Sequence, residues 1–485
     1  MANDKDFSLG QELDAKAQEL EVQRKEMLKK GVKLTLQDIV NKIESHTEDI
    51  TALMIGKIQK AQLQNLAASV IVEGGEGRVR VPAFTEQNDK TSPVWVFVGT
   101  HWEVIDNVQV FFDFIRDACT KMGLGMEFVD DVPFCRKLKK QVEWKLSRHT
   151  ETEEDENVVL VNFINGTLVI HRDGTRHIRP HRREDFFRYV LPYCYDPLAE
   201  CPRFLQFMDE VLPNQSVHKP ILEYIASCLV PWLHEEKVMA FLGSGSNGKS
   251  KLINTIEKLF GENGVSHENL YDLTRDEVHR ANIEGKLINV ATENEGRINS
   301  AAFKTLASRE PISCKKLYSQ PYTMKQYARL LFAFNDMPKI KGGHANMRRW
   351  LLVKFGVRIS EEQADLDLEE KLARELSGIM NLVLDVLPEL LKRKKFSKSE
   401  AMEQAVRELE VGNDDVLQFV EDRCETNTST LTKGTELFKA FCEYCQQNKL
   451  VEITIREFYR RLEEKYQSKP DGHQKAFNIN VVRYE

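Results

Sequence analysis

The chain has 485 residues and a formal net charge of −7, with 41% hydrophobic and 29% charged residues. This balance is typical of globular proteins, and the length suits roughly two to four domains. No apolar run approaches the roughly 20 residues of a membrane span, and the first residues lack a signal-peptide core. The nine cysteines form no regular framework, which suits a reducing compartment. We therefore expect a cytoplasmic protein without a membrane partner.

The amino-terminal part of the chain has a helical pattern up to residue 72. The glycine-rich stretch 74–77 and the polar stretch 85–92 interrupt it. The apolar run 94–98 then predicts a strand, and residues 108–122 predict a helix.

The middle of the chain begins with two predicted strands, 158–163 and 167–170, followed by a helical region at 197–233. From residue 236 to 356 strands and helices alternate, as an α/β fold requires.

A phosphate-binding loop sequence, GSGSNGKS, lies between the apolar run 238–242 and the helix-like segment 251–260. It matches the G-x-x-x-x-G-K-[ST] pattern in its strand–loop–helix context. Glycines let backbone N–H groups surround phosphates, and the next helix presents its positive end to them. Lys249 would reach the terminal phosphates and Ser250 would bind Mg²⁺, so we expect ATP and Mg²⁺ as cofactors. The candidate nucleotide-binding residues are Gly243, Ser244, Gly245, Ser246, Asn247, Gly248, Lys249 and Ser250.

Polar side chains follow two later strands of this region. Glu293 and Glu295 come after the strand predicted at 286–292, where a carboxylate can hold Mg²⁺ through water and align the attacking water. The alternative is two surface glutamates. Asn335 follows the strand at 330–334 and can contact the terminal phosphate, although Asn-Asp-x-Pro also suits a simple turn.

Arg348 and Arg349 precede the next apolar run. The planar guanidinium group suits phosphate charge in a transition state and is often supplied by a neighbouring subunit. The alternative is a solvated pair of side chains. We include both arginines, with Lys249, Glu293, Glu295 and Asn335, among the candidate catalytic residues.

The acidic chain contains a basic window at residues 296–355, with twelve Lys and Arg against Glu310 and Asp336. Local charge matters more than the total for phosphate contacts. This window therefore keeps nucleic acid open as a partner.

The carboxyl-terminal part begins with an amphipathic helical region at 363–395. Residues 414–485 have helix–helix–strand character, which is compatible with a winged-helix domain. Cys442 and Cys445 form a C-x-x-C pair, with Cys424 and His473 nearby in the sequence. A zinc site is one interpretation; two thiols in a helix, without a second close pair, is the favoured one.

These motifs together resemble those of superfamily 3 helicases, most closely the poxvirus, phage and plasmid primase-helicase branch. The loop at 243–250 matches the first motif of that family, 291–296 is similar to the second, 334–338 to the third and 347–353 to the arginine motif. Residues 303–316 are similar to the segment that leads into the DNA-contacting hairpin.

The sequence departs from the family pattern at three places. Glu293 and Glu295 are separated by Asn294 rather than adjacent, which leaves open which carboxylate activates water. Ser-Arg-Glu at 308–310 replaces a Gly-Gly-Asp-like turn, and Arg329 stands where a lysine is usual.

The resemblance implies an α/β fold: an AAA+-type P-loop ATPase core with an amino-terminal α+β and helical part and a carboxyl-terminal winged-helix-like part. The domains we expect are a helical region (1–92), a small α+β region (93–157), a helical domain (158–235), the ATPase core (236–357), a helical extension (358–412) and the winged-helix-like domain (413–485).

The resemblance also implies a ring, usually a hexamer, that hydrolyses ATP and moves 3′-to-5′ on single-stranded DNA in phage, mobile-element or plasmid replication. A hairpin at 312–325 would line the pore, with Lys315, Lys316 and Tyr318 touching the strand. An ordinary basic hairpin on the outer surface is the alternative. Expected partners are single-stranded and forked DNA, further copies of the chain and a separate primase or polymerase.

Two other functions stay open. A complete primase-helicase would need clustered carboxylates for two metals, and Asp130 with Asp131 is the suggestive pair before the ATPase. Residues 1–150 are too short and too helical for such a module, so we expect this chain to be the helicase portion and the primase to be a separate protein. An origin-binding initiator ATPase would use the winged-helix-like end to bind duplex DNA.

Overall fold

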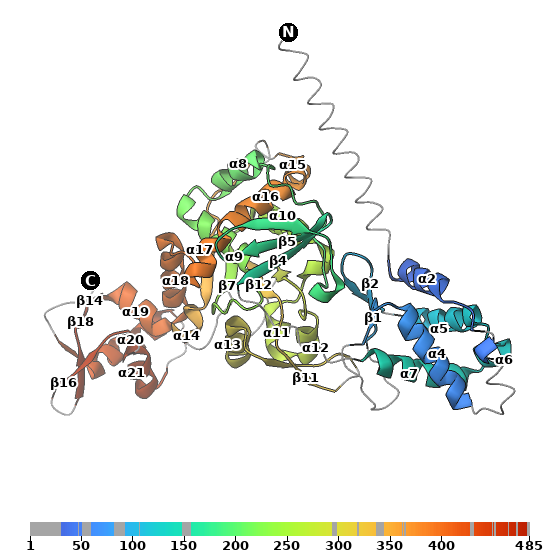
Figure 1. Ribbon diagram of the computed structural model, residues 1–485. Helices are drawn as coiled ribbons and strands as arrows, with labels where there is room; N and C mark the ends of the chain where they lie inside the picture. The colour runs from blue at the N-terminus through green and yellow to red at the C-terminus, as the bar shows by residue number, and fades with distance from the viewer. Residues whose placement is uncertain are drawn as a thin grey trace, which may run out of the picture. The chain divides into compact units, whose positions relative to one another are not determined.

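The computed structural model describes residues 31–46, 48–50, 60–81, 93–105, 107–147, 157–292, 298–317, 320–335, 344–360, 362, 365–426, 431–448, 450, 453–463, 465–471 and 474–482. The chain forms two compact units (Figure 1). Unit 1 contains the residues up to Ala199 with two short segments, Lys258–Gly264 and Leu376–Gly378. Unit 2 contains the remainder.

The first part of unit 1 is a helical core with a small sheet. Its apolar residues recur at helical spacing, so Ile39, Ala67, Ile115 and Leu138 are fully buried in one cluster. The helices are α2 (Val32–Lys42), α4 (Lys60–Gly74), α5 (Val108–Met122), α6 (Met126–Val129) and α7 (Val132–Leu146). The antiparallel sheet contains β1 (Val79–Arg80), β2 (Trp95–Phe97) and β3 (Trp102–Val104). The strand and the helix that the sequence predicts around 94–122 are therefore present.

The second part of unit 1 is an antiparallel meander of β4 (Val158–Phe163), β5 (Gly166–His171) and β6 (Arg176–Arg179), followed by the 3₁₀ turn η1 (Arg183–Asp185). Both predicted strands are confirmed. The region expected to be helical over 158–235 thus begins with strands, because its alternating β-branched residues favour a pleated surface.

Unit 2 contains a five-stranded parallel sheet, in which β7 and β12 lie side by side (Figure 1). Its strands are β7 (Val238–Leu242), β8 (Val265–Ser266), β9 (Ile288–Ala291), β12 (Arg329–Phe334) and β13 (Trp350–Lys354), in the spatial order β13-β7-β12-β9-β8. Every residue of β12 is buried, as expected of a parallel strand covered on both faces. The alternating pattern of the sequence is therefore confirmed.

Short helices surround this sheet, and a two-stranded hairpin precedes β12. The hairpin pairs β10 (Ile312–Cys314) with β11 (Tyr322–Met324), as the sequence predicts. The helices are α8 (Pro202–Val211), α9 (His218–Ser227), α10 (Lys249–Gly264), α11 (Leu270–Arg275), α12 (Glu277–Ala281), α13 (Ser300–Ser308), α14 (His344–Met347), α15 (Leu368–Arg374), α16 (Leu376–Asp385), α17 (Leu387–Arg393) and α18 (Glu400–Asn413), with the 3₁₀ turn η2 (Gln215–Val217).

The carboxyl-terminal residues have a separate apolar core that includes Phe419, Phe441, Phe458 and Phe477. The elements are α19 (Asp415–Arg423), β14 (Cys424–Thr426), β15 (Thr432–Lys433), α20 (Gly434–Asn448), α21 (Ile455–Glu463), β16 (Ser468–Asp471), β17 (Gln474–Phe477) and β18 (Ile479–Val481). The described residues of this part thus contain three helices where the sequence pattern indicated two.

Two further expectations from the sequence concern a zinc site and membrane-spanning segments. Cys442 and Cys445 both lie in α20, and the described residues include no group of three or more potential metal ligands; His473 lies outside those residues. Among the helices that the structure describes, none has the length and apolar character that crossing a bilayer requires.

Two ion pairs of opposite polarity connect α9 to α17 in unit 2. Glu223 on α9 is fully buried and accepts hydrogen bonds from Arg393 Nη2 at 2.6 Å and from Ser397 Oγ at 2.8 Å. Lys219 on the same helix is exposed and pairs with Glu389 at 2.6 Å. The two pairs provide a matched comparison of buried and exposed charge.

We expect Glu223→Ala to lower the free energy of unfolding by about 1.5–3 kcal/mol, because it removes the buried charged acceptor of hydrogen bonds from Arg393 and Ser397. Glu389→Ala should lower it far less, since water already solvates that pair. Urea unfolding of both variants checks this, and equal losses would contradict it.

Candidate nucleotide-binding site

The loop between β7 and α10 has a backbone that requires glycine. Gly245 and Gly248 have positive φ angles of 101° and 83°, a region that residues with a Cβ rarely adopt. A Cβ on Gly248 would lie 2.3 Å from Val211 Cγ1, and one on Gly243 would lie 2.2 Å from Asn247 Nδ2. The motif glycines are therefore explained by conformation and by close packing.

Lys249 is the first residue of α10, and three oxygens surround its ammonium group. Nζ donates to Gly243 O at 2.8 Å, to Phe334 O at 2.8 Å and to Asn335 Oδ1 at 3.2 Å. Burial lowers the pKa of this ammonium group from its ordinary value. Because β7 and β12 are parallel neighbours, their carboxyl ends meet, and this brings Lys249 together with Asn335.

Asn247 connects the loop to the end of β13. Its Nδ2 donates to Phe355 O at 3.3 Å, and its Oδ1 accepts from Lys249 N at 3.3 Å. Ser246 O accepts a further hydrogen bond from Ile359 N at 2.8 Å. Sequence reasoning missed these contacts, because they depend on which strand lies beside β7.

A second connection lies on the first turns of α10. Glu369 of α15 accepts from Lys251 Nζ at 2.8 Å and from Asn254 Nδ2 at 3.0 Å. Glu369 thereby connects α10, the helix that follows the loop, to α15. No motif signals this contact in the sequence.

The residues of this loop fit a triphosphate. Ser244, Gly245, Ser246 and Ser250 are exposed, while Lys249 is held at the amino end of α10, where the helix dipole favours negative charge. The site also lies at the carboxyl edge of the sheet beside the strand where the order reverses, the usual ligand position in open α/β sheets.

Glu293 and Glu295 lie outside the described residues. The strand that they follow, β9, is present, and Ala291 at its end pairs with Phe332 of β12. This strand therefore ends at the same edge of the sheet as the loop. The roles of the two carboxylates remain predictions.

Arg348 and Arg349 lie at the opposite edge. They precede β13, and Arg349 O accepts from Val238 N, the first residue of β7, at 2.8 Å. The loop follows the carboxyl end of β7, five residues further on, which is roughly 15 Å in an extended strand. The two arginines are thus not brought together with Lys249 of their own chain.

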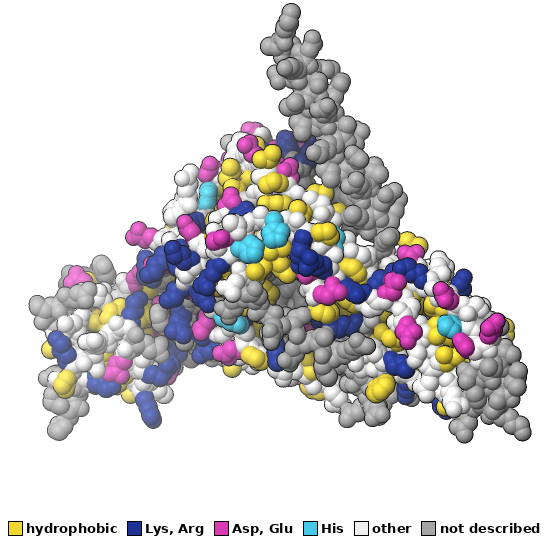
Figure 2. All heavy atoms as spheres, viewed as in Figure 1, with side chains coloured by type: hydrophobic (Ala, Val, Ile, Leu, Met, Phe, Trp, Pro, Cys, Tyr) yellow, Lys and Arg dark blue, Asp and Glu magenta, His cyan; other side chains and the backbone are white. Residues whose placement is uncertain are grey.

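These two arginines have different surroundings. The Arg349 side chain is 10% exposed and pairs with Glu236 at 3.0 Å, whereas that of Arg348 is 59% exposed and lies 3.8 Å from the same carboxylate. Lys and Arg side chains gather over α14, α17 and α18 on the face drawn in Figure 2. Arg348 is therefore the one available to a second molecule.

The hairpin presents cations near its turn. Lys316 is exposed and lies 4.0 Å from Glu284, and Lys315 N donates to Glu277 O at 2.9 Å. Leu317 is 66% exposed. Tyr318, the third predicted contact, lies outside the described residues.

Arg329 has a structural position. Only 2% of it is exposed, and its guanidinium donates to Ser227 O at 3.0 Å and Leu233 O at 2.6 Å. Burial lowers its pKa to about 10. The Arg329 guanidinium thus binds backbone carbonyl oxygens within unit 2.

The acidic pair considered for metal binding in unit 1 is engaged in ion pairs. Asp130 pairs with Arg116 and Asp131 with Lys60, both at 2.8 Å. Each carboxylate has a partner on a different helix, which gives the pair a structural explanation.

Three family models match parts of the chain. Residues 88–213 match the D5 N terminal like family, and residues 412–479 match the Poxvirus D5 protein-like family. Residues 241–349, which contain the loop and the hairpin, match a family of unknown function, DUF5906. Among curated proteins, a putative helicase of Acanthamoeba polyphaga mimivirus is 25% identical over 260 residues. The chain is similar to D5-type superfamily 3 helicases. The resemblance that the motifs indicate is therefore confirmed.

That match covers 47% of this chain and 27% of the relative's length. Two apo structures of the NrS-1 C-terminal region each cover 86% of this chain and 98% of theirs, at 12% identity. Their TM-scores are 0.49 and 0.47.

We expect Arg348→Ala to abolish ATP hydrolysis without loss of thermal stability, because the side chain is exposed. Mixing it with Lys249→Ala protein should restore part of the activity, since a mixed interface can combine an intact loop with an intact arginine. Absence of recovery in demonstrated mixed assemblies would contradict action between subunits.

Arg349→Ala is the matched control. It should lower the melting temperature, because it removes the buried partner of Glu236, and mixing with Lys249→Ala protein should not compensate for that loss of stability. Differential scanning calorimetry together with an ATPase assay separates the two residues.

Proposed function

We propose that this chain is the motor of an ATP-dependent DNA helicase that works as a ring, a hexamer as is usual in the family it resembles, and moves 3′-to-5′ on single-stranded DNA in phage, mobile-element or plasmid replication. The observation that carries the proposal is the hydrogen bond from Lys249 to Asn335. It joins the first and third helicase motifs at one edge of the sheet.

The strand order supports an AAA+-type core. Numbered along the chain, the five parallel strands lie in the order 5-1-4-3-2. This places the strand before the loop next to the strand that ends at Asn335, with the strand before Glu293 beyond it. The three motifs would then meet around one ligand.

Each residue has a part in hydrolysis under this proposal. When bound, ATP with Mg²⁺ supplies the phosphoryl group that is transferred to water. Lys249 would neutralise negative charge, and Ser250 would hold the metal. Glu293 or Glu295 would orient the water, while Arg348 of a neighbouring copy would stabilise transition-state charge.

The hairpin would couple hydrolysis to DNA movement. β11 ends at Met324 and β12 begins at Arg329, so a short connection joins the hairpin to the strand that ends at Asn335. A shift at Asn335 on loss of the terminal phosphate could therefore move Lys315 and Lys316. Their positive charge suits the DNA backbone.

The second candidate is an origin-binding initiator ATPase. Apart from β14 and β18, which pair with each other, the elements α19, β15, α20, α21, β16 and β17 follow as helix, strand, helix, helix, strand, strand, the order of a winged helix. Such a domain would place a helix in a duplex groove. A separate primase or polymerase is the partner that either function would need.

Lys249→Ala tests the nucleotide site. We expect ATP hydrolysis to fall by about 100-fold or more, because the lysine neutralises charge that grows in the transition state. Circular dichroism should stay unchanged. Hydrolysis at the wild-type rate in folded protein would remove the loop from the mechanism.

Lys315→Ala with Lys316→Ala tests the hairpin. Basal ATPase should persist, whereas unwinding of a forked substrate should be lost. The slope of log affinity against log salt on single-stranded DNA should flatten by about 1.4 if each lysine contacts a phosphate.

Lys219→Ala with Lys371→Ala removes the same charge from exposed positions of unit 2 and serves as the control. Strand displacement by both double variants decides the outcome. Normal unwinding with an unchanged slope in the hairpin variant would place the hairpin away from the DNA path. Displacement without any ATP requirement would contradict the helicase proposal itself.

A further inference from the structure

The small sheet of unit 1 has two chemically different faces. Val79 and Val96 are opposite one another in the register and are buried in the helical core. Arg80 and Trp95 form the next pair, so they point to the other face. Phe97 shares that face with Trp95, because side chains two residues apart in a strand do so.

The segment after β6 covers part of this second face with stacked side chains. Phe186 stacks on Trp102 at 6.0 Å, and the Arg80 guanidinium lies 4.1 Å above the Phe186 ring. The Arg188 guanidinium lies 4.7 Å above the Trp95 ring. We call Arg80, Trp95, Phe97, Phe186 and Arg188 the arginine–aromatic face.

The segment that contributes Phe186 and Arg188 to this face is rich in arginine. Residues 171–188 contain six arginines and three acidic residues. Two of those acids are engaged nearby, since Asp185 pairs with Arg179 and Glu184 with Arg183. Arg188 is exposed and makes no ion pair with any residue that the structure describes. The segment therefore leaves positive charge on the surface beside the aromatic rings.

The guanidinium groups of Arg80 and Arg188, each stacked on an aromatic ring, repel each other. Burial lowers the pKa of Arg80, and the charge of Arg188 lowers it further. The fold thus holds two like charges close together on one face. An anion between them would relieve this repulsion.

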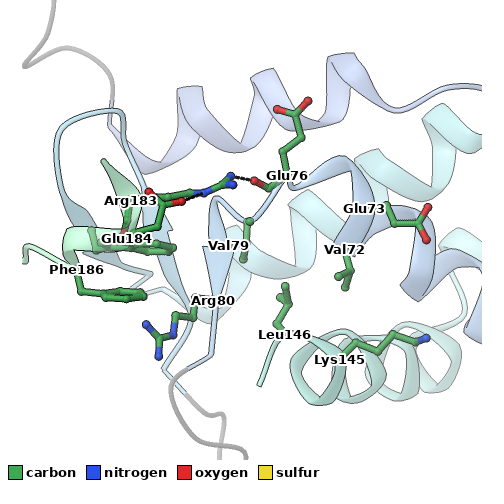
Figure 3. A pocket seen from close by; sticks show the side chains of 12 residues that line it. Val72, Glu73, Glu76, Val79, Arg80, Lys145, Leu146, Arg183, Glu184 and Phe186 are labelled. Atoms are coloured by element: carbon green, nitrogen blue, oxygen red, sulfur yellow. Dashed lines mark hydrogen bonds and ion pairs between the residues drawn. The ribbon is translucent and has the colours of Figure 1, made fainter. Parts of the chain in front are cut away.

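An open pocket of about 370 Å³ adjoins the face. Arg80, Arg183 and Phe186 lie at one end, with Val72, Glu73 and Lys145 at the other (Figure 3). The acids at its wall are partly neutralised, because Glu76 pairs with Lys42 at 2.9 Å. Its lining combines apolar side chains with three cations, Arg80, Lys145 and Arg183, and three carboxylates, Glu73, Glu76 and Glu184.

We propose that the arginine–aromatic face of unit 1 binds single-stranded nucleic acid, separately from the hairpin of unit 2. Arg80 and Arg188 contact adjacent phosphates, while unstacked bases lie on the guanidinium planes and the exposed parts of Trp95 and Phe97. Stacking on aromatic rings and on arginine planes is the usual way in which single strands are held. The pocket beside Phe186 accepts one base.

The chemistry favours a single strand over two other ligands. An acidic peptide would use the charge but leave the rings without planar partners. Duplex DNA keeps its bases stacked inside, so it presents phosphates, sugars and base edges to such a face but no free base planes. The interleaving of rings and guanidinium groups therefore selects a strand with free bases.

The first experiment measures binding of a labelled oligothymidylate of about 20 nucleotides by the full chain, without ATP, at several salt concentrations. Arg80→Gln with Arg188→Ala should weaken binding by about tenfold and flatten the salt slope by about 1.4, because two phosphate contacts are lost. Trp95→Leu should weaken binding by about fivefold with the slope unchanged, since no charge is removed.

The matched control is Lys33→Ala with Lys121→Ala, which removes two exposed charges from the helices of unit 1. It should bind as the wild type does. Each variant is also measured on the Lys315→Ala, Lys316→Ala background, which isolates unit 1 from the hairpin. Equal losses in test and control variants, or a larger loss for duplex than for single-stranded DNA, would overturn the proposal.

Photocrosslinking provides a readout that does not depend on the variants folding. An oligothymidylate containing photoreactive thymidine analogues should crosslink to peptides that carry Trp95, Phe97 or Phe186 in the wild-type chain. Crosslinks confined to 312–325 would overturn the unit 1 site while leaving the helicase proposal intact. Loss of ATPase in Lys249→Ala protein with these crosslinks retained would separate the two sites.

Discussion

The ammonium group of Lys249 is the point on which the candidate site depends. It is buried among the carbonyl oxygens of Gly243 and Phe334 and the side-chain oxygen of Asn335, and a buried charge is tolerated only when it has such partners. The three oxygens come from two strands whose carboxyl ends must be adjacent. The Lys249 ammonium group therefore has these partners because β7 and β12 are parallel neighbours in the sheet.

The predicted site residues fall into two groups, one at the carboxyl edge of the sheet and one at the opposite edge. Asn335 and the end of β9, the strand before Glu293, lie at the same edge as the loop. Arg348 and Arg349 precede β13 at the far edge. Hydrolysis assisted by arginine would then require a second copy of the chain, and assembly would control activity. Under the proposal, Arg348, whose side chain is 59% exposed, would make this contact, while Arg349 pairs with Glu236 at 3.0 Å.

For phosphate contacts, the local concentration of positive charge in this chain matters more than its net charge. The protein is acidic overall, with a net charge of −7, but cations are concentrated in the hairpin region of unit 2 and in the segment after β6 in unit 1. Arg329 shows that position decides the use of such a charge, because it lies inside unit 2 and binds two carbonyl oxygens. Lys316 and Arg188 are instead exposed, and the two proposals place them in contact with phosphate groups.

The sequence by itself determined the loop, the alternation of strands and helices from 236 to 356, the hairpin and the family resemblance. These depend on local spacing, on glycine at positive φ and on apolar periodicity, all of which are readable along the chain. Only the tertiary structure decided that Lys249 meets Asn335, that Glu369 holds the start of α10, and that Arg80 lies opposite Trp95. Those contacts join residues far apart in the sequence, and they follow from strand order and register, which no short pattern encodes. The strands at 158–179 were assigned to a helical domain for the same reason: a boundary depends on which elements share a core.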